Sequence, residues 1–166
     1  MDFNYLEKEY IMKLVKYNSQ YDNLINDYYL PEDQLYYSAM PSEAVEISRN
    51  NNDRHTILGL DDSELVTFFI LHENDAVQPY SNQPNDILLR SFSTNYKHQG
   101  KGYARKTLEL LPDFMKEHIP YIDGIVLGVN VKNTAAQALY KKCGYVDEGN
   151  RVMGSKGEMI VMKYYL

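Results

Sequence analysis

The sequence has 166 residues and lacks several features that define large classes of protein. It contains a single cysteine, Cys143, so it cannot form an internal disulfide and is not a small disulfide-stabilised domain. No segment approaches the ~18 consecutive apolar residues of a membrane span. The start, MDFNYLEKEY, carries acidic residues where a secretion signal would carry cations before an apolar run. We therefore expect a soluble, cytoplasmic protein with no membrane partner.

Basic residues are outnumbered by acidic ones. The chain has 17 Lys and Arg against 23 Asp and Glu, which gives a formal net charge of -6. Proteins that bind duplex nucleic acid need many cations to neutralise phosphates, so this balance argues against a nucleic-acid partner and leans weakly toward amines. A hydrophobic content of 44% excludes disorder, and the length fits one domain, which we assign to residues 1–166.

Tyrosine is the residue in excess. The chain has 16 tyrosines but only 5 phenylalanines and no tryptophan. A tyrosine ring can pack on one edge while its hydroxyl reaches a polar partner, which suits the wall of a wet pocket. A compositional bias of the whole chain would give the same count, so the tyrosines indicate function only where other residues support them.

Hydrophobic periodicity predicts a mixture of strands and helices. Pro112 is expected to interrupt and kink one of the helices. This order predicts an α/β (α+β) fold, with a mixed sheet covered by helices. The longest loop is expected at residues 74–86. Strands are expected at residues 11–17, 55–60, 65–72, 87–94, 124–129, 145–151 and 158–165, and helices at residues 20–29, 42–50, 102–118 and 133–143.

The segment SFSTNYKHQGKGYAR is the most informative, because a strand runs through a glycine-rich turn directly into a helix. Gly100, Gly102 and Ala104 lack the side chains that would block approach to the backbone. Amides at a helix N-terminus bind anions without a charged side chain, and Lys101 and Arg105 add positive charge beside them. The pattern predicts a site for a pyrophosphate.

Other interpretations fit part of this turn. A Walker loop would need Lys and then Ser or Thr after its second glycine, where this chain has Gly102 followed by Tyr103. A dinucleotide-binding fingerprint would need a third glycine, where Arg105 stands. A glycine-rich turn that only connects two elements is the remaining alternative if the motif stands alone.

A second motif, NTAAQALYKKCGY, follows the next expected strand, with apolar residues at helical spacing and a glycine that ends the helix. Together the two motifs resemble the GNAT N-acetyltransferase superfamily at Gln99, Gly102, Ala104, Asn133, Ala136, Leu139, Tyr140, Gly144 and Tyr145. The resemblance is close over residues 87–145 and rests elsewhere on the order of the elements. It implies a single GNAT-like domain with a mixed central sheet of about six to seven strands and helices on both faces.

The resemblance implies acetyl-CoA as the acetyl donor, held where two parallel strands splay apart, and no metal. In the family, the end of the fourth strand pairs with the pantetheine arm and the glycine turn meets the pyrophosphate. Asn133 would lie beside the pantetheine, and Tyr140 would be the catalytic residue that faces the departing sulfur. The cofactor-binding residues implied here are Phe92, Ser93, Thr94, Gly100, Lys101, Gly102, Tyr103, Ala104, Arg105 and Asn133.

The implied reaction is direct attack of a neutral amine on the thioester carbonyl. A backbone amide of the splayed fourth strand would stabilise the oxyanion. Tyr140, with an ordinary pKa of about 10, can protonate a leaving thiolate whose conjugate acid has a pKa of about 8.5. A tyrosine that only packs on its helix is the alternative interpretation.

The usual general bases of the family are missing. Branches that acetylate proteins often have a glutamate where this chain has Leu88 or Gly128. We therefore doubt a protein-acetylating role and expect a water chain, or a residue of another element, to take the proton. His72 and Glu73 are candidates, with an ordinary role at the end of a strand as the alternative.

Acceptor specificity in the family is set near the first helices, which correspond to residues 21–37 here. Aromatic faces beside carboxylates suit a cationic amine through cation–π attraction and charge pairing. We therefore predict a small-molecule amine acceptor, such as a polyamine or an amino sugar, although an amphipathic surface helix with packed tyrosines fits equally well. The residues concerned are Tyr28, Tyr29, Tyr36, Tyr37, Asp27, Glu32 and Asp33.

Two functions remain open at this point. The first is an acyltransferase that acetylates a small cationic amine. The second is a binding module that keeps the CoA site without catalysis, which the two empty base positions favour and Tyr140 opposes. Cys143 is expected to be a buried core thiol. The sequence leaves the oligomeric state open, a homodimer included.

Overall fold

The strand patterns of the sequence pair into one seven-stranded sheet in the computed structural model, which describes residues 11–166. The strand register is irregular at three places, between β2 and β3, between β3 and β4, and between β6 and β7. The strands are β1 (Met12–Lys16), β2 (Arg54–Asp61), β3 (Glu64–His72), β4 (Asp86–Thr94), β5 (Gly124–Asn130), β6 (Val146–Gly154) and β7 (Gly157–Tyr165).

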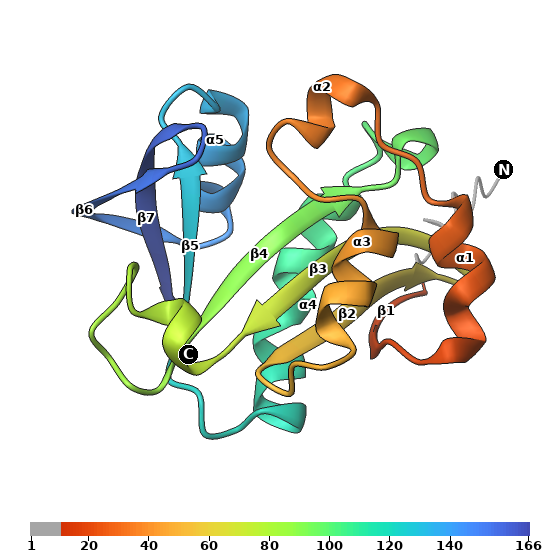
Figure 1. Cartoon of the computed structure of the whole chain (residues 1–166), viewed down its shortest axis with the longest axis horizontal. Coiled ribbons are helices and arrows are strands. Elements are labelled where there is room, and N and C mark those ends of the chain that lie inside the picture. Colours follow the sequence, from red (N-terminus) through yellow and green to blue (C-terminus); the bar gives the residue numbers. More distant parts are fainter. Residues whose placement is uncertain (1–10) are drawn as a thin grey trace, which may run out of the picture.

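Helices cover both faces of the sheet. Figure 1 shows α1 and α3 in front of the N-terminal strands and α4 behind β3 and β4, while α5 lies beside β5. Short 3-10 turns precede α1, follow β3 and follow β4. The α-helices are α1 (Asp22–Asp27), α2 (Glu32–Leu35), α3 (Pro41–Ser48), α4 (Tyr103–His118) and α5 (Thr134–Lys142).

The strand order is β1-β2-β3-β4-β5-β7-β6. Every neighbouring pair is antiparallel except β4 and β5, which are parallel because α4 carries the chain back across the sheet between them. The predicted mixed sheet with helices on both faces is therefore confirmed, at seven strands. One parallel pair near the centre divides the sheet into an N-terminal and a C-terminal half.

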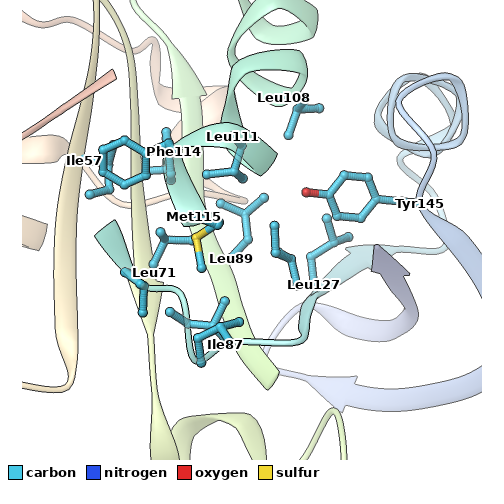
Figure 2. Close-up of a cluster of buried hydrophobic side chains, with 14 of the residues drawn as sticks. Ile57, Leu71, Ile87, Leu89, Leu108, Leu111, Phe114, Met115, Leu127 and Tyr145 are labelled. Carbon is cyan, nitrogen blue, oxygen red and sulfur yellow. The ribbon is translucent and has the colours of Figure 1, made fainter. Parts of the chain in front are cut away.

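The larger core lies between the sheet and α4. Leu111 and Met115 are fully buried and contact side chains of the central strands, and Tyr145 closes the cluster on the side of α5 (Figure 2). A second cluster on the opposite face packs α1 and α3 against Leu58 and Phe68. Both faces of the central strands are thus covered, which explains their nearly continuous apolar sequences.

Three sequence-based details differ from the structure. The helix α4 continues through Pro112, so the expected interruption is wrong; buried residues on both sides of the proline hold the helix against the sheet. The short helix α2 was missed, and the loop at 74–86 contains a 3-10 turn, Asn74–Val77. The acidic start of the chain, residues 1–10, lies outside the described residues.

Candidate active site

The two parallel strands separate soon after they meet. Pairing between β4 and β5 extends over three positions and ends at Leu88 and Val126. Beyond them the strands diverge, as their upper ends do in Figure 1, where α5 and α2 flank the opening. A cleft of about 750 Å³ lies there, lined by the later residues of both strands, the segment around α2, the start of α5 and the β6–β7 turn. The splayed strands that the resemblance implied are present.

A bulge shapes the β4 wall of this cleft. Phe68 pairs with Ser93 and Ile70 pairs with Arg90, so two residues of β4 lie opposite one residue of β3. Ser91, inside the bulge, has a φ of 54°, a left-handed conformation that is uncommon for any residue but glycine. A bulge bends its strand and changes the direction of the following residues. It therefore sets the path of the strand from Phe92 to Thr94 along the cleft.

The glycine turn leads into α4 at the edge of this region. Gly100 and Gly102 have φ values of 75° and 83°, and a Cβ added at either would meet no atom within 4 Å. The amide of Lys106 donates to Gly102 O at 3.1 Å, and the earlier amides of the first turn have no carbonyl within the helix to receive them. Open space in front of these amides is what a bound anion needs.

The turn does not line the cleft itself, but Gln99 connects the two. Its Nε2 donates to Thr94 O at 3.0 Å and to the side chain of Gln34 at 2.6 Å. Tyr103 is buried, its hydroxyl donates to Asp61, and its ring packs edge-on against His98.

The remaining predicted residues of the turn are accounted for in the same way. Arg105 Nε pairs with Glu109 at 3.0 Å on the exposed surface of α4, and Lys101 is exposed. Ala104 is half-buried in the first turn of the helix. The turn therefore presents amides and one unburied ammonium group to solvent.

The helix α5 brings two predicted residues to the cleft. Asn133 caps the helix, its Oδ1 accepting from the Ala136 amide at 3.2 Å. Tyr140 lies further along the same helix, and its ring centroid is 6.4 Å from that of Phe92 across the opening. Both line the cleft together with Phe92, Ser93 and Thr94. Burial raises the pKa of Tyr140, which keeps its hydroxyl protonated at neutral pH.

Cys143, near the end of α5, is less enclosed than the sequence suggested. It is partly exposed and packs at the margin of the main core. Partial burial still raises the pKa of its thiol. The helix ends at Gly144, whose φ of 93° confirms the predicted C-terminal glycine.

The two empty base positions are filled by apolar packing. Leu88 is buried, and a Cβ added at Gly128 would lie 2.9 Å from Cε1 of Tyr80 and 3.2 Å from Cε of Met159. Contacts below 3.0 Å do not occur without displacement, so no side chain fits at position 128 unless Tyr80 moves. Tyr80 belongs to the long loop, and no pattern in the sequence predicts that it lies here.

The alternative base candidates at the end of β3 lie outside the cleft. The Glu73 carboxylate accepts from Tyr121 at 2.6 Å and contacts His55 Nε2 at 2.5 Å. His72 has a buried Nδ1 without a hydrogen-bond partner among residues 11–166, and burial, together with Arg54 and Arg90, lowers its pKa. Neither His72 nor Glu73 is among the residues that line the cleft.

The expected acceptor segment divides into a buried part and an exposed part. Tyr28 is 3% exposed and its hydroxyl lies 2.8 Å from Ser93 Oγ, so it belongs to the core. Tyr29 is exposed and packs edge-on against Tyr96. Neither ring lines the cleft. The structure therefore brings neither of these two tyrosines into the cleft.

Tyr36 and Tyr37 do line the cleft, with ring centroids 4.8 Å apart, and Lys156 Nζ lies 4.4 Å above the Tyr36 ring. The expected carboxylates Asp27, Glu32 and Asp33 do not line it. Among the residues that do, the charged ones are Arg90 and Lys156, both missed from the sequence because spacing along the chain does not reveal which residues meet in space. The cleft is cationic and aromatic rather than acidic.

Within residues 11–166 no group of three or more His, Cys, Asp or Glu side chains could hold a metal ion. No helix of this part of the chain has the length and apolar character needed to cross a membrane.

Comparison with known proteins agrees with the geometry. At the sequence level, the N-acetyltransferase YbbJ of Bacillus subtilis (strain 168), itself uncharacterized, is 36% identical over 143 residues, which cover 86% of this chain and 89% of the relative. Among solved structures, the aminoglycoside acetyltransferase AAC(6')-Ib in complex with paromomycin and acetyl-CoA superposes with a TM-score of 0.74 at 13% identity, over 93% of each chain.

A second solved structure has the same fold. The spermidine N-acetyltransferase of Vibrio cholerae in complex with CoA and spermine gives a TM-score of 0.63 at 21% identity, over 93% of this chain and 95% of that one. The decisive match is to the family itself, since the sequence model of the Acetyltransferase (GNAT) family covers residues 18–145. This chain belongs to the GNAT family of acetyltransferases, which are acyltransferases.

Proposed function

We propose that this protein, as one catalytic domain over residues 1–166, transfers the acetyl group of acetyl-CoA to the primary amine of a small acceptor that is cationic in solution. One observation carries the proposal. The residues that the two motifs single out, Phe92 to Thr94 on β4 and Asn133 and Tyr140 on α5, meet in a single cleft where the parallel strands part. Backbone, cap and hydroxyl groups then face one another across the opening.

The fit of acetyl-CoA follows from the backbone. After Leu88 the edge of β4 that faces β5 has no strand partner in the part of the chain that the structure describes, so Phe92, Ser93 and Thr94 can pair with the amides of a pantetheine arm as an added strand would. The pyrophosphate would meet the amides of the α4 first turn, beside Gly100 and Gly102. Gln99 connects the two parts, because it bonds Thr94 O from within the turn motif.

The charges of the cleft bear on deprotonation of the acceptor. An amine attacks only as the neutral form, and nearby positive charge and burial both lower the pKa of an ammonium group. Arg90 and Lys156 supply positive charge, and no carboxylate lines the cleft within the described chain to oppose them. We infer that the cleft favours the neutral amine electrostatically and releases the proton to water, so that no dedicated carboxylate base is needed.

The proposed transfer forms one covalent bond and breaks one. The amine nitrogen forms a bond to the thioester carbonyl carbon, and the C–S bond breaks. The nitrogen loses a proton to water, and Tyr140 gives its hydroxyl proton to the departing sulfur before regaining one from solvent. The burial that raises the pKa of Tyr140 keeps this proton on the hydroxyl until the sulfur departs.

The acceptor class is supported by the cleft and by relatives. The exposed Tyr37 ring offers an aromatic face to an arriving cation, whereas Lys156 already covers the Tyr36 ring. Related folds act on spermidine and on aminoglycosides, both of which carry primary amines. A small amine therefore fits better than a protein terminus.

A thiol-release assay with purified protein tests this function. Acetyl-CoA should yield free CoA with at least one member of a panel of polyamines, amino sugars and simple alkylamines, and not without an amine. Turnover confined to peptides would contradict the small-amine acceptor. Tyr121→Ala, a change of an exposed tyrosine outside the cleft, is a suitable control.

A catalytically weak acetyl-CoA-binding module is the second candidate. The packing of Tyr80 over Gly128 favours it, as does the absence of a carboxylate among the residues of 11–166 that line the cleft. Tight acetyl-CoA binding with no CoA release for any amine or peptide in the panel would support this second function over the first.

A further inference from the structure

Tyr80 lines two cavities of the structure. The first is the cleft already described, and the second, of about 380 Å³, is lined by β5, β6, β7 and residues 78–83 of the long loop. Val126 and Lys163, which pair across β5 and β7, line this second cavity. Within the described chain, Tyr80 is the one residue that lines both cavities.

The Tyr80 ring is held in place rather than free to swing. It packs with Val77, Leu88 and Val126, and its Cε1 atom lies close over the backbone of Gly128. The Tyr80 amide donates to Val77 O at 2.8 Å, which fixes the turn that carries the ring. The absence of a side chain at Gly128 is what allows the ring to lie there.

A buried ion pair fastens the loop on the other side of the ring. Ser81 Oγ donates to Asp86 Oδ2 at 2.6 Å, and Lys163 Nζ lies 2.9 Å from the same oxygen. Asp86 is 2% exposed, so this link is shielded from solvent. Tyr80 is thus a fixed wall whose position depends on β4 and β7 together.

The second cavity has the chemistry to receive a cation. Both of its basic side chains are already paired, Lys163 with Asp86 at 2.9 Å and Arg151 with Asp147 at 2.9 Å. Glu148 also lines it, and Tyr165 donates a hydrogen bond to the Glu148 carboxylate. An ammonium group entering this cavity would therefore meet a carboxylate, with no unpaired basic side chain among the lining residues of the described chain.

We propose that Tyr80 is a specificity-determining residue that closes the cleft toward the second cavity, so that short amines are acetylated and chains long enough to reach Glu148 are excluded. The inference rests on the proposed acetyl transfer to an amine. The Tyr80 ring selects against longer amines because it fills the space that they would need. Removal of the ring joins the two cavities into one continuous acceptor site.

The test compares linear amines of increasing length, from ethylenediamine through putrescine to spermidine, in the thiol-release assay. In the natural protein kcat/KM should fall with length. Tyr80→Ala should raise the ratio of kcat/KM for spermidine over ethylenediamine by about tenfold or more, since a longer chain gains new contacts and loses a clash. An unchanged ratio in a folded Tyr80→Ala protein would overturn the inference.

Two further variants protect the test against simple loss of packing. Tyr80→Leu keeps an apolar contact with Leu88 and should give an intermediate ratio. Tyr80→Phe keeps the ring, so it should keep the natural length preference even if the rate changes. Circular dichroism and acetyl-CoA affinity report folding for each variant. Tyr121→Ala removes an exposed tyrosine ring outside both cavities and should keep the natural ratio.

Different experimental results would overturn the inference about Tyr80 and the proposed function. Turnover by the natural protein with equal length preference in all Tyr80 variants would overturn the inference alone. No turnover with any amine, while acetyl-CoA still binds, would overturn the proposed function and the inference with it.

Discussion

The hydroxyl groups of Tyr28 and Ser93 lie 2.8 Å apart, which joins the segment after α1 to the β4 wall of the cleft. The Tyr28 ring packs edge-on against Phe68 with centroids 6.3 Å apart, and burial raises the pKa of its hydroxyl. A tyrosine at this position therefore supports the β4 wall of the cleft. It also fixes the start of the segment that carries Tyr36 and Tyr37 to the cleft.

Replacement of Tyr28 tests this support. Tyr28→Phe keeps the ring and removes the partner of Ser93 Oγ, so the free energy of unfolding should fall by about 1 kcal/mol. Urea denaturation followed by circular dichroism measures it. Tyr29→Phe, in a side chain that is 55% exposed, is the matched control and should have little effect. Equal stabilities of the two variants would mean that the Tyr28–Ser93 hydrogen bond adds nothing.

Replacement of Tyr140 tests the chemical step. Tyr140→Phe keeps the packing on Phe92 and removes the proposed proton donor, so kcat should fall by about 10²-fold, a typical contribution of general acid catalysis. The dissociation constant of acetyl-CoA, measured by calorimetry, should change little. Tyr145→Phe removes a neighbouring buried hydroxyl, 5.7 Å away between ring centroids, and serves as the control. If kcat survives in Tyr140→Phe, the hydroxyl takes no part in the reaction.

Alkaline conditions should weaken the fold before they deprotonate the site. Burial raises the pKa of Tyr28, Tyr140 and Tyr145, so each keeps its proton in the folded state at a pH where the unfolded chain has lost it. The unfolded state then binds fewer protons, and stability falls as pH rises above about 10, the ordinary pKa of tyrosine. Below that pH these groups cost nothing.

The measurement is the free energy of unfolding from pH 7 to pH 11, together with kcat/KM for the amine. Stability should be level near neutrality with respect to these groups and should decline above about pH 10. Activity should rise with pH as the amine loses its proton, with no loss from Tyr140 in the range where the protein remains folded. A fall in kcat/KM as the pH rises just above neutrality would contradict a protonated Tyr140 as the proton donor.

The backbone parts of the site could be predicted from the sequence. Gly100 and Gly102 predict an anion site because a missing side chain affects the backbone of its own turn. Both have the left-handed conformation that glycine favours. The segment from Asn133 to Gly144 indicated a capped helix for the same reason, and the cap bond to Ala136 is present. Motifs of this kind depend on neighbours within a few residues.

The side-chain parts could not be predicted, because they depend on contacts between distant segments. Tyr28 was expected in the acceptor surface, but its partner Ser93 is 65 residues away in the chain. The left-handed Ser91 carries no signal in its residue type. Tyr80 reaches Gly128 only through the path of a loop that is fastened by Asp86.

The glycine turn offers the last test, because one variant can be examined with two donors. Gly102 has a φ of 83° and caps α4, so Gly102→Ala places a Cβ in the open space before the helix amides and strains the backbone by about 1 kcal/mol. Acetyl-CoA should bind about tenfold more weakly, since the pyrophosphate loses close approach to the amides.

Acetyl-pantetheine, which has the thioester arm and no pyrophosphate, is the matched ligand for this variant. Its affinity should be nearly equal in the natural protein and in Gly102→Ala, because Phe92 to Thr94 and Asn133 are unchanged. Calorimetry with both donors separates the two halves of the site. Equal weakening of both donors would mean that the substitution deforms β4 through Gln99 and Thr94 rather than blocking an anion, and the turn would then have no direct role in phosphate binding.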